Sequence, residues 1–238
     1  MLGVIFIYSF LSGALDVYYE KVRILTETPR GTVTLLRHKS TGERCVLRRF
    51  LGKETVYEKL LTIRSPHLPQ ILAVASNEEW VLVLEEYIPG DSLASVLEAS
   101  VCSVRQTRRI AMDICRGLWV LHSLGAVHRD VKPENILLRG KDAVLIDFNA
   151  SRVMVPEQSA DTVVLGTTGY AAPEQYGLSQ TDGRTDIYSL GVTMNVMLTG
   201  RHPSQKLASG AMGRIIQRCT MMAPEKRYQT VLDLMEVL

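Results

Sequence analysis

The stretch VHRDVKPENILL, residues 127–138, contains an aspartate, a lysine two residues later and an asparagine three residues after that. It lies between a segment with helical periodicity and the strand-like run NILLRG. Reactions at phosphate need a group that orients a hydroxyl, a cation near the transferred phosphoryl group and oxygen ligands for Mg²⁺. Asp130, Lys132 and Asn135 can fill these roles in turn, and an ordinary charged surface loop is the alternative.

A second carboxylate follows in AVLIDFNASR, residues 143–152. Asp147 stands there at the end of an apolar run that reads as a strand. Carboxylate and amide oxygens are ligands that Mg²⁺ accepts. We therefore expect Asp147 to complete a metal site with Asn135.

Composition excludes several classes of protein. The chain has 238 residues, with Lys+Arg 27 against Asp+Glu 25 and a formal net charge of +2. This balance does not single out nucleic acid as a partner. The four cysteines are scattered, without a C-x-x-C pair, which argues against a zinc site and a disulfide framework. A cytoplasmic protein is the default expectation.

The first third of the chain has short strand-like runs, and the remainder is mostly helical. We expect an antiparallel sheet with one helix over residues 19–88, and a larger helical lobe over residues 89–238 with a cleft at the joint. The run 103–125 predicts a long amphipathic helix, with Ser103 as N-cap and Gly125 as stop. Residues 1–18 form an apolar extension; residues 1–15 are too short to span a membrane, and membrane association through them is the minor alternative.

Five motifs occur in an order that resembles the eukaryotic-like protein kinase superfamily, in its bacterial serine/threonine branch. HRDVKPEN is similar to the catalytic loop, DFN to the D-F-G motif, and GTTGYAAPE to the end of an activation segment. DIYSLG resembles the start of the central helix, and PEKRY the closing arginine motif. The resemblance runs from about Tyr19 onward and implies an α+β, two-lobed protein kinase fold that uses ATP and Mg²⁺.

The resemblance also implies roles for individual residues. Asp130 would be the catalytic base, Lys132 the phosphate contact, and Asn135 and Asp147 the Mg²⁺ ligands. Thr167 would face Asp130 and Lys132, a pairing that accompanies serine/threonine specificity in the family.

Three further residues would have structural roles by the same resemblance. Glu174 and Arg227 would form a buried ion pair. Asp186 would brace the catalytic loop.

The nucleotide-binding part departs from the family pattern. TETPRG, residues 26–31, stands where the family has a glycine-rich loop, and it keeps only Gly31. In CVLRRF, residues 45–50, Val46 would lie under the adenine, and Arg48 would replace the nucleotide-pairing lysine. Its partner would be Glu54 or Glu58 of the following helix, with Glu58 preferred.

The segment LEEYIPGDSL, residues 84–93, resembles the hinge between kinase lobes. Glu86 and Ile88 would offer backbone groups to adenine, and Glu85 would gate the back of the pocket. A carboxylate at that position is costly to bury without a partner, so a cation should face it. Arg48 is one candidate.

Together these features predict a kinase that phosphorylates serine or threonine in proteins, with itself among its substrates. The alternative is a pseudokinase that acts as a nucleotide-binding or scaffold module. Retention of Asp130, Asn135 and Asp147 favours the enzyme. The altered loop and Arg48 favour the alternative.

Overall fold

The computed structural model describes the backbone of residues 2–53, 55–153, 167, 169–176 and 181–238. The chain divides into two compact units, with the main boundary between Ile88 and Pro89. The first unit comprises residues 1–65 and 69–88, and the second comprises residues 66–68 and 89–238. Strands dominate the first unit and helices the second, which confirms the predicted α+β class.

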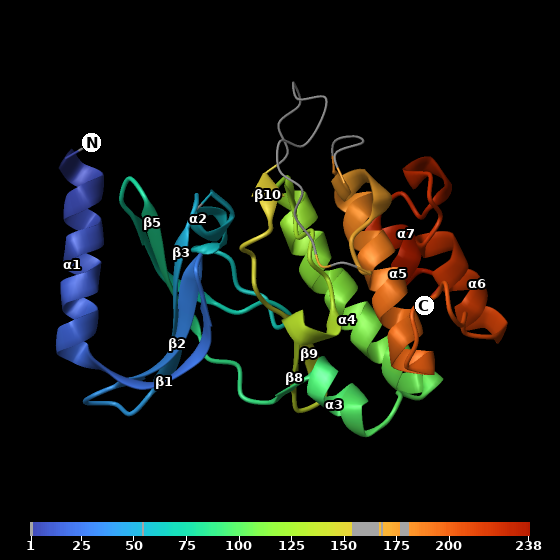
Figure 1. Cartoon of the computed structure of the whole chain (residues 1–238), viewed down its shortest axis with the longest axis horizontal. Coiled ribbons are helices and arrows are strands. Elements are labelled where there is room, and N and C mark those ends of the chain that lie inside the picture. Colours follow the sequence, from blue (N-terminus) through green and yellow to red (C-terminus); the bar gives the residue numbers. More distant parts are fainter. Residues whose placement is uncertain (1, 54, 154–166, 168, 177–180) are drawn as a thin grey trace. The chain divides into compact units, whose positions relative to one another are not determined.

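Five antiparallel strands form the sheet of the first unit (Figure 1). Their order is β1-β2-β3-β5-β4, so β3 lies at the centre of the sheet. Because the side chains of a strand alternate between its two faces, β3 contributes to the packing on both sides. The strands are β1 (Tyr19–Thr28), β2 (Gly31–His38), β3 (Arg44–Leu51), β4 (Ile71–Ser76) and β5 (Trp80–Glu86).

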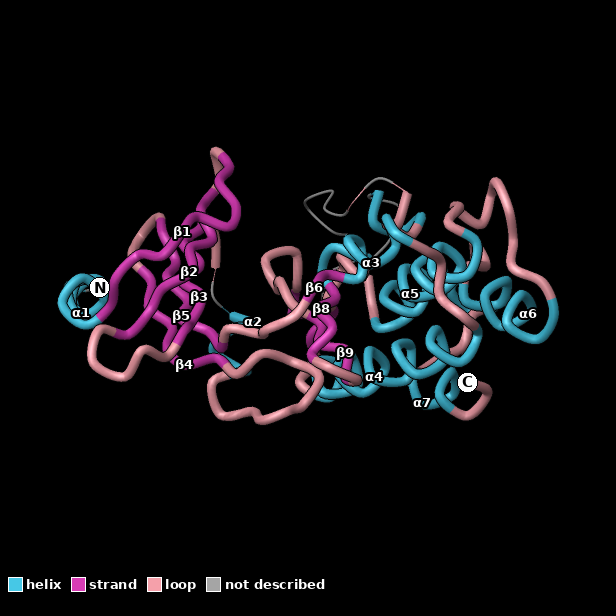
Figure 2. Tube along the Cα trace, turned by 90° about the horizontal axis from the view of Figure 1, so that it is seen from below, coloured by secondary structure: helices cyan, strands magenta, loops and turns pink. Residues whose placement is uncertain are grey.

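The apolar N-terminal segment forms helix α1 (Leu2–Tyr18), which packs on one face of this sheet (Figures 1 and 2). Leu15 is buried against Leu36, Cys45 and Leu84. The ammonium of Lys39 donates to the carbonyls of residues 16 and 17, both at 2.8 Å, where the helix dipole favours a cation. Among the described residues, none of the helices combines the length and the apolar character needed to cross a membrane.

The opposite face of the sheet carries the short helix α2 (Thr55–Leu60). Tyr57 of α2 is buried, and its ring centroid lies 5.6 Å from that of Phe50 on β3. Val46 and Arg48 share this face with Phe50, because the three residues are spaced by two along the strand. The strand therefore places an arginine among apolar side chains.

The second unit is mainly helical, with two small antiparallel sheets. The sheets have the strand orders β6-β8-β9 and β10-β7. Short strands and single helical turns connect the longer helices and shape the loops described below. The helices are α3 (Leu93–Ala99), α4 (Val104–Ser123), α5 (Gly183–Thr199), α6 (Gly210–Cys219) and α7 (Val231–Met235). The strands are β6 (Asp91–Ser92), β7 (Ala126–Val127), β8 (Ile136–Arg139), β9 (Asp142–Leu145) and β10 (Arg152–Val153). The 3₁₀ turns are η1 (Pro133–Asn135), η2 (Pro173–Tyr176) and η3 (Pro224–Lys226).

Helix α4 confirms the amphipathic pattern predicted from the sequence. Ser103 is its N-cap and forms a capping box with Gln106, and Gly125 follows its C-cap with a φ of 69°. Its apolar residues Ile110, Ile114, Leu118 and Leu121 recur at helical spacing, and all four are buried. The helix contacts α5, α7 and β9, so it forms the centre of the second unit.

Candidate active site

The loop between β7 and η1 is held by a buried aspartate of α5. The Asp186 carboxylate accepts the backbone N–H of His128 at 2.9 Å and that of Arg129 at 2.8 Å. Arg129 has a φ of 69°, a left-handed conformation that costs a side-chain-bearing residue about 1–3 kcal/mol. The two hydrogen bonds offset this cost and fix the loop, which confirms the bracing role predicted for Asp186.

His128 connects the same loop to the chain that follows β9. Its Nε2 lies 3.2 Å from the carbonyl of Ile146, and its Nδ1 lies 3.3 Å from the backbone N–H of Asp130. A neutral ring satisfies both contacts, with Nε2–H donating and Nδ1 accepting. Burial lowers the pKa of His128 below 6.5, which favours this neutral form. The residue therefore supports the loop as a packed, uncharged side chain.

Asp130, Lys132 and Thr167 form a compact polar cluster. The Thr167 hydroxyl donates to Asp130 Oδ1 at 2.7 Å. Lys132 Nζ lies 2.8 Å from Asp130 Oδ2 and 2.5 Å from Thr167 Oγ1. The predicted approach of Thr167 to both residues is confirmed. The Thr167 hydroxyl therefore lies between the carboxylate of Asp130, which accepts its hydrogen bond, and the ammonium of Lys132, which is close to its oxygen.

The environment keeps Asp130 ionised. Burial by itself raises the pKa of this carboxyl, but the hydrogen bonds from Lys132 and Thr167 and the charge of Lys132 outweigh burial. The resulting pKa lies below the ordinary value of 3.8. At neutral pH the side chain is therefore a negatively charged hydrogen-bond acceptor, which can orient a hydroxyl group.

Asn135 and Asp147 come together at one end of the β8–β9 hairpin. The backbone N–H of Ile146 donates to the carbonyl of Asn135 at 2.9 Å, which places Asp147 one residue beyond that contact. The Asn135 amide nitrogen donates to the backbone carbonyl and to Oδ2 of Asp130, both at 2.9 Å. This orientation commits the amide nitrogen to Asp130 and leaves the amide oxygen available. An amide oxygen and a carboxylate fit the donor set of Mg²⁺.

In the first unit, Arg48 of β3 pairs with Glu85 of β5. Arg48 Nε lies 2.7 Å from Glu85 Oε1, and the two side chains are 5% and 3% exposed. Val46 lies directly opposite Glu85 in the strand register, and Arg48 lies two residues further along the same face. The structure therefore confirms that Glu85 faces a cation and that Arg48 supplies it.

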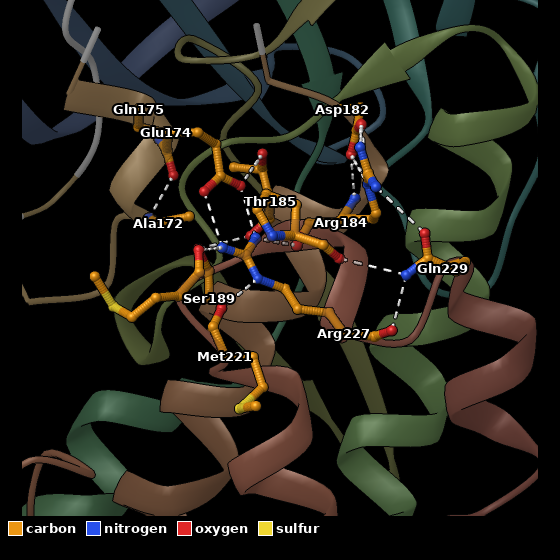
Figure 3. A network of polar contacts seen from close by, with 12 residues as sticks. Ala172, Glu174, Gln175, Asp182, Arg184, Thr185, Ser189, Met221, Arg227 and Gln229 are labelled. Carbon is orange, nitrogen blue, oxygen red and sulfur yellow. Dashed lines mark hydrogen bonds and ion pairs between the residues drawn. The ribbon is translucent and has the colours of Figure 1, made fainter. Parts of the chain in front are cut away.

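Glu174 and Arg227 form a buried pair in the second unit (Figure 3). Arg227 Nη1 donates to Glu174 Oε1 at 2.7 Å, and Nη2 donates to Oε2 at 2.9 Å. The remaining guanidinium hydrogens donate to the backbone carbonyls of residues 184, 221 and 222. Thr185 donates to Glu174 Oε1 at 2.9 Å. This network joins η2 to the chain after α6 and confirms the predicted ion pair.

Comparison with known proteins agrees with this geometry. The family model described as "Protein kinase domain" matches residues 19–236.

The chain belongs to the protein kinase domain family.

Several bacterial proteins are similar to this kinase domain. "Serine/threonine-protein kinase D" of Synechocystis is 28% identical over 221 residues, which cover 81% of this chain and 42% of that protein. "Serine/threonine-protein kinase PknA" of Nostoc is 30% identical over 218 residues, with 81% and 38% covered. "Serine/threonine-protein kinase pkn2" of Myxococcus xanthus is 32% identical over 152 residues, with 60% and 18% covered. The chain spans less than half the length of these relatives.

The partner of Arg48 differs from the one that the sequence favoured. Glu58 is exposed on α2 and makes no ion pair with Arg48 among the described contacts, so the preference for Glu58 is wrong. Tyr57, the residue before it, is buried against the sheet, whereas Glu58 lies on the exposed side of the helix. Glu54 lies outside the described residues. Arg48 donates its Nε hydrogen to Glu85 on the neighbouring strand.

Close packing of two strands requires Gly31, the one glycine that stands where the family has a glycine-rich loop. Gly31 follows the Pro29–Arg30 turn and begins β2, where a Cβ would lie 2.2 Å from the carbonyl oxygen of Arg49. Any other residue at this position would force β2 and β3 apart. Thr28 closes the turn, because its hydroxyl donates to the carbonyl of Gly31 at 3.1 Å. The β1–β2 connection is therefore a tight hairpin.

The hinge residues lie at the end of the first unit. The backbone N–H of Glu86 donates to the carbonyl of Gln70 at 2.8 Å, and its carboxylate accepts the N–H of Gln70 at 3.1 Å. The N–H of Glu86 is therefore occupied within the first unit. Ile88 is the last residue of the unit, and its side chain is buried.

One supporting residue was missed in the sequence. Gln175 of η2 is fully buried, and its amide nitrogen donates to the carbonyl of Arg129 at 2.8 Å. Its amide oxygen accepts the N–H of Ala172 at 3.0 Å. Gln175 thus connects the segment around Glu174 to the catalytic loop. A buried glutamine beside a motif glutamate has no local periodic signal, so the sequence alone could not identify this role.

Proposed function

We propose that this kinase domain transfers the γ-phosphoryl group of ATP to serine or threonine hydroxyls of proteins, its own chain included. The observation that supports this most directly is the Thr167 hydroxyl held between Asp130 and Lys132. It shows that this carboxylate and ammonium can bind an aliphatic hydroxyl of the type found in the proposed substrates.

In the proposed reaction, Asp130 accepts the hydrogen bond of the substrate hydroxyl and points its oxygen lone pair toward the phosphoryl group. Its lowered pKa makes it a weak base, so its main contribution is orientation, with proton acceptance late in the transfer. Lys132 supplies positive charge beside the attacking oxygen, where negative charge has to be stabilised. For the reaction, Thr167 has to give its place on Asp130 to the substrate.

Asn135 and Asp147 would hold Mg²⁺, whose chemistry is to neutralise the charge of the phosphate oxygens. Asn135 also donates to Asp130, so it links the metal position to the residue that orients the hydroxyl. For nucleotide binding we propose Gly31, Val46, Arg48, Glu86, Ile88 and Asp147. Val46 is buried on the same face of β3 as Arg48, which suits contact with a flat apolar base.

The experiment is a phosphotransfer assay with labelled ATP and Mg²⁺ on a dephosphorylated protein substrate and on the chain itself. Asp130→Asn keeps the shape of the side chain and should reduce transfer by about 10²–10⁴-fold. Asp142→Asn, at an exposed aspartate of β9, is the matched control and should be silent. Phosphoamino acid analysis of the product then distinguishes serine or threonine from tyrosine.

The alternative is a pseudokinase that binds nucleotide or acts as a scaffold. One observation favours it: Glu85 engages the Nε of Arg48, the residue that replaces the nucleotide-pairing lysine. If wild type and Asp130→Asn bind a fluorescent ATP analogue equally and neither transfers phosphate, the pseudokinase is correct. Measurable transfer by wild type that is lost in Asp130→Asn excludes it.

A further inference from the structure

A hollow in the second unit is lined by four polar residues, three of which are cations. Arg105, Gln106 and Arg109 come from the first two turns of α4, and Lys141 comes from the turn between β8 and β9. The hollow has a volume of about 440 Å³. Two elements that are distant in sequence therefore bring three basic side chains to one hollow, and none of its lining residues belongs to the catalytic loop.

These cations have no ion-pair partner among the described residues. The side chains of Arg105, Arg109 and Lys141 make no ion pair or hydrogen bond there. Another arginine of the same helix behaves differently, because Arg116 pairs with Asp113 at 2.9 Å. The formal net charge of the whole chain is only +2, so this gathering of basic side chains is a local feature.

The positions of the two arginines oppose the stability of the helix. Arg105 is the second residue after the N-cap Ser103, and the first turn contains no acidic residue. The helix dipole disfavours cations at this end. Arg109 follows four residues later on the same face, where like charges repel. An anion in the hollow relieves both effects, so this arrangement favours a binding role over a purely structural one.

We propose that the basic hollow formed by Arg105, Gln106, Arg109 and Lys141 binds an acidic segment of a protein partner, rich in aspartate or glutamate. Guanidinium groups bind carboxylates in a two-pronged geometry, and the exposed side chains can be reached by an extended peptide. The hollow is many times larger than the roughly 30 Å³ of one water molecule, so several side chains fit. Binding at this site does not require phosphotransfer.

The test measures binding of a fluorescein-labelled peptide of alternating aspartate and glycine to the full chain by fluorescence anisotropy at low salt. The variant is Arg105→Glu with Arg109→Glu, and the matched control is Arg201→Glu with Arg214→Glu, two exposed arginines with the same change in charge. We expect the variant to bind at least about tenfold more weakly and the control to stay within roughly twofold of wild type. Glutamate suits the first turns of a helix, so the variant should melt no lower than wild type.

Two results would overturn the proposal. One is equal loss of peptide binding in the variant and the control, because this would mean that only the net charge matters. The other is displacement of the peptide by inorganic phosphate at submillimolar concentration, because the hollow would then be a site for a small anion. Retained binding of the acidic peptide in the presence of phosphate, together with loss of binding in the variant alone, supports the protein segment as the ligand.

Discussion

The buried pair of Arg48 and Glu85 leads to a prediction about stability that does not depend on activity. The two charged groups are 2.7 Å apart and almost completely shielded from water. At an effective dielectric constant of about 20, their attraction is on the order of 6 kcal/mol, and the cost of removing both ions from water offsets much of it. Replacing one partner keeps the desolvation cost of the other. We therefore expect Arg48→Met to lower the free energy of unfolding by about 3–5 kcal/mol.

The double substitution Arg48→Met with Glu85→Met tests whether the loss of stability in the single variant comes from the charge that is left unpaired. Both positions lie beside the buried apolar side chains of Val46 and Val83. Because methionine fills the space without a charge, the double variant should be about as stable as wild type, or more stable by about 1–4 kcal/mol. The control is Arg49→Met, an exposed residue on the other face of β3. It loses only a contact with the Trp80 ring at 4.0 Å, worth about 0.5–1 kcal/mol.

Urea denaturation followed by tryptophan fluorescence measures these values. The chain has two tryptophans, Trp80 on β5 of the first unit and Trp119 on α4 of the second. A Trp119→Phe background makes Trp80 the reporter for the unit that contains Arg48. The reasoning is refuted if Arg48→Met unfolds within about 0.5 kcal/mol of wild type. It is also refuted if the effects of Arg48→Met and Glu85→Met, each measured alone, simply add in the double variant.

Three other predictions follow from the second unit. Asp147→Asn should abolish Mg²⁺-dependent transfer in the labelled-ATP assay without changing the melting temperature, since it removes a ligand oxygen and no core volume; unchanged turnover would mean that the metal site is misassigned. Arg227→Ala should destabilise the fold by about 3–5 kcal/mol in thermal melts, because it leaves the buried Glu174 without its cation; a melt equal to that of wild type would contradict this. His128 has a pKa in the folded chain below its unfolded value of about 6.5. Between these two values the unfolded chain binds one more proton, so the free energy of unfolding falls as the pH is lowered, by up to about 1.4 kcal/mol per pH unit. If His128→Asn shows the same slope, this residue is not the cause.

Features that depend on a local pattern of residues could be predicted from the sequence alone. The apolar residues of α4 recur with the period of a helix, and Ser103 and Gly125 mark its ends, so the helix and its buried face could be predicted correctly. The order of the motifs around Asp130 and Asp147 likewise indicated the family that the comparison identified. A helix face and a motif order are both properties of residues that are close in the chain.

Contacts between residues that are distant in the chain depend on the folded structure. Arg48 and Glu85 are 37 residues apart, and the β3–β5 register brings them together. The sequence offered this pair only as one candidate and preferred Glu58 of the nearby helix as the partner of Arg48. In the same way, Lys141 reaches the arginines of α4 only because the β8–β9 hairpin packs against that helix. Strand register and hairpin packing are fixed by the burial of whole faces, to which each residue contributes only a small part. The partner of a buried charge therefore cannot be predicted from the residues beside it in the chain.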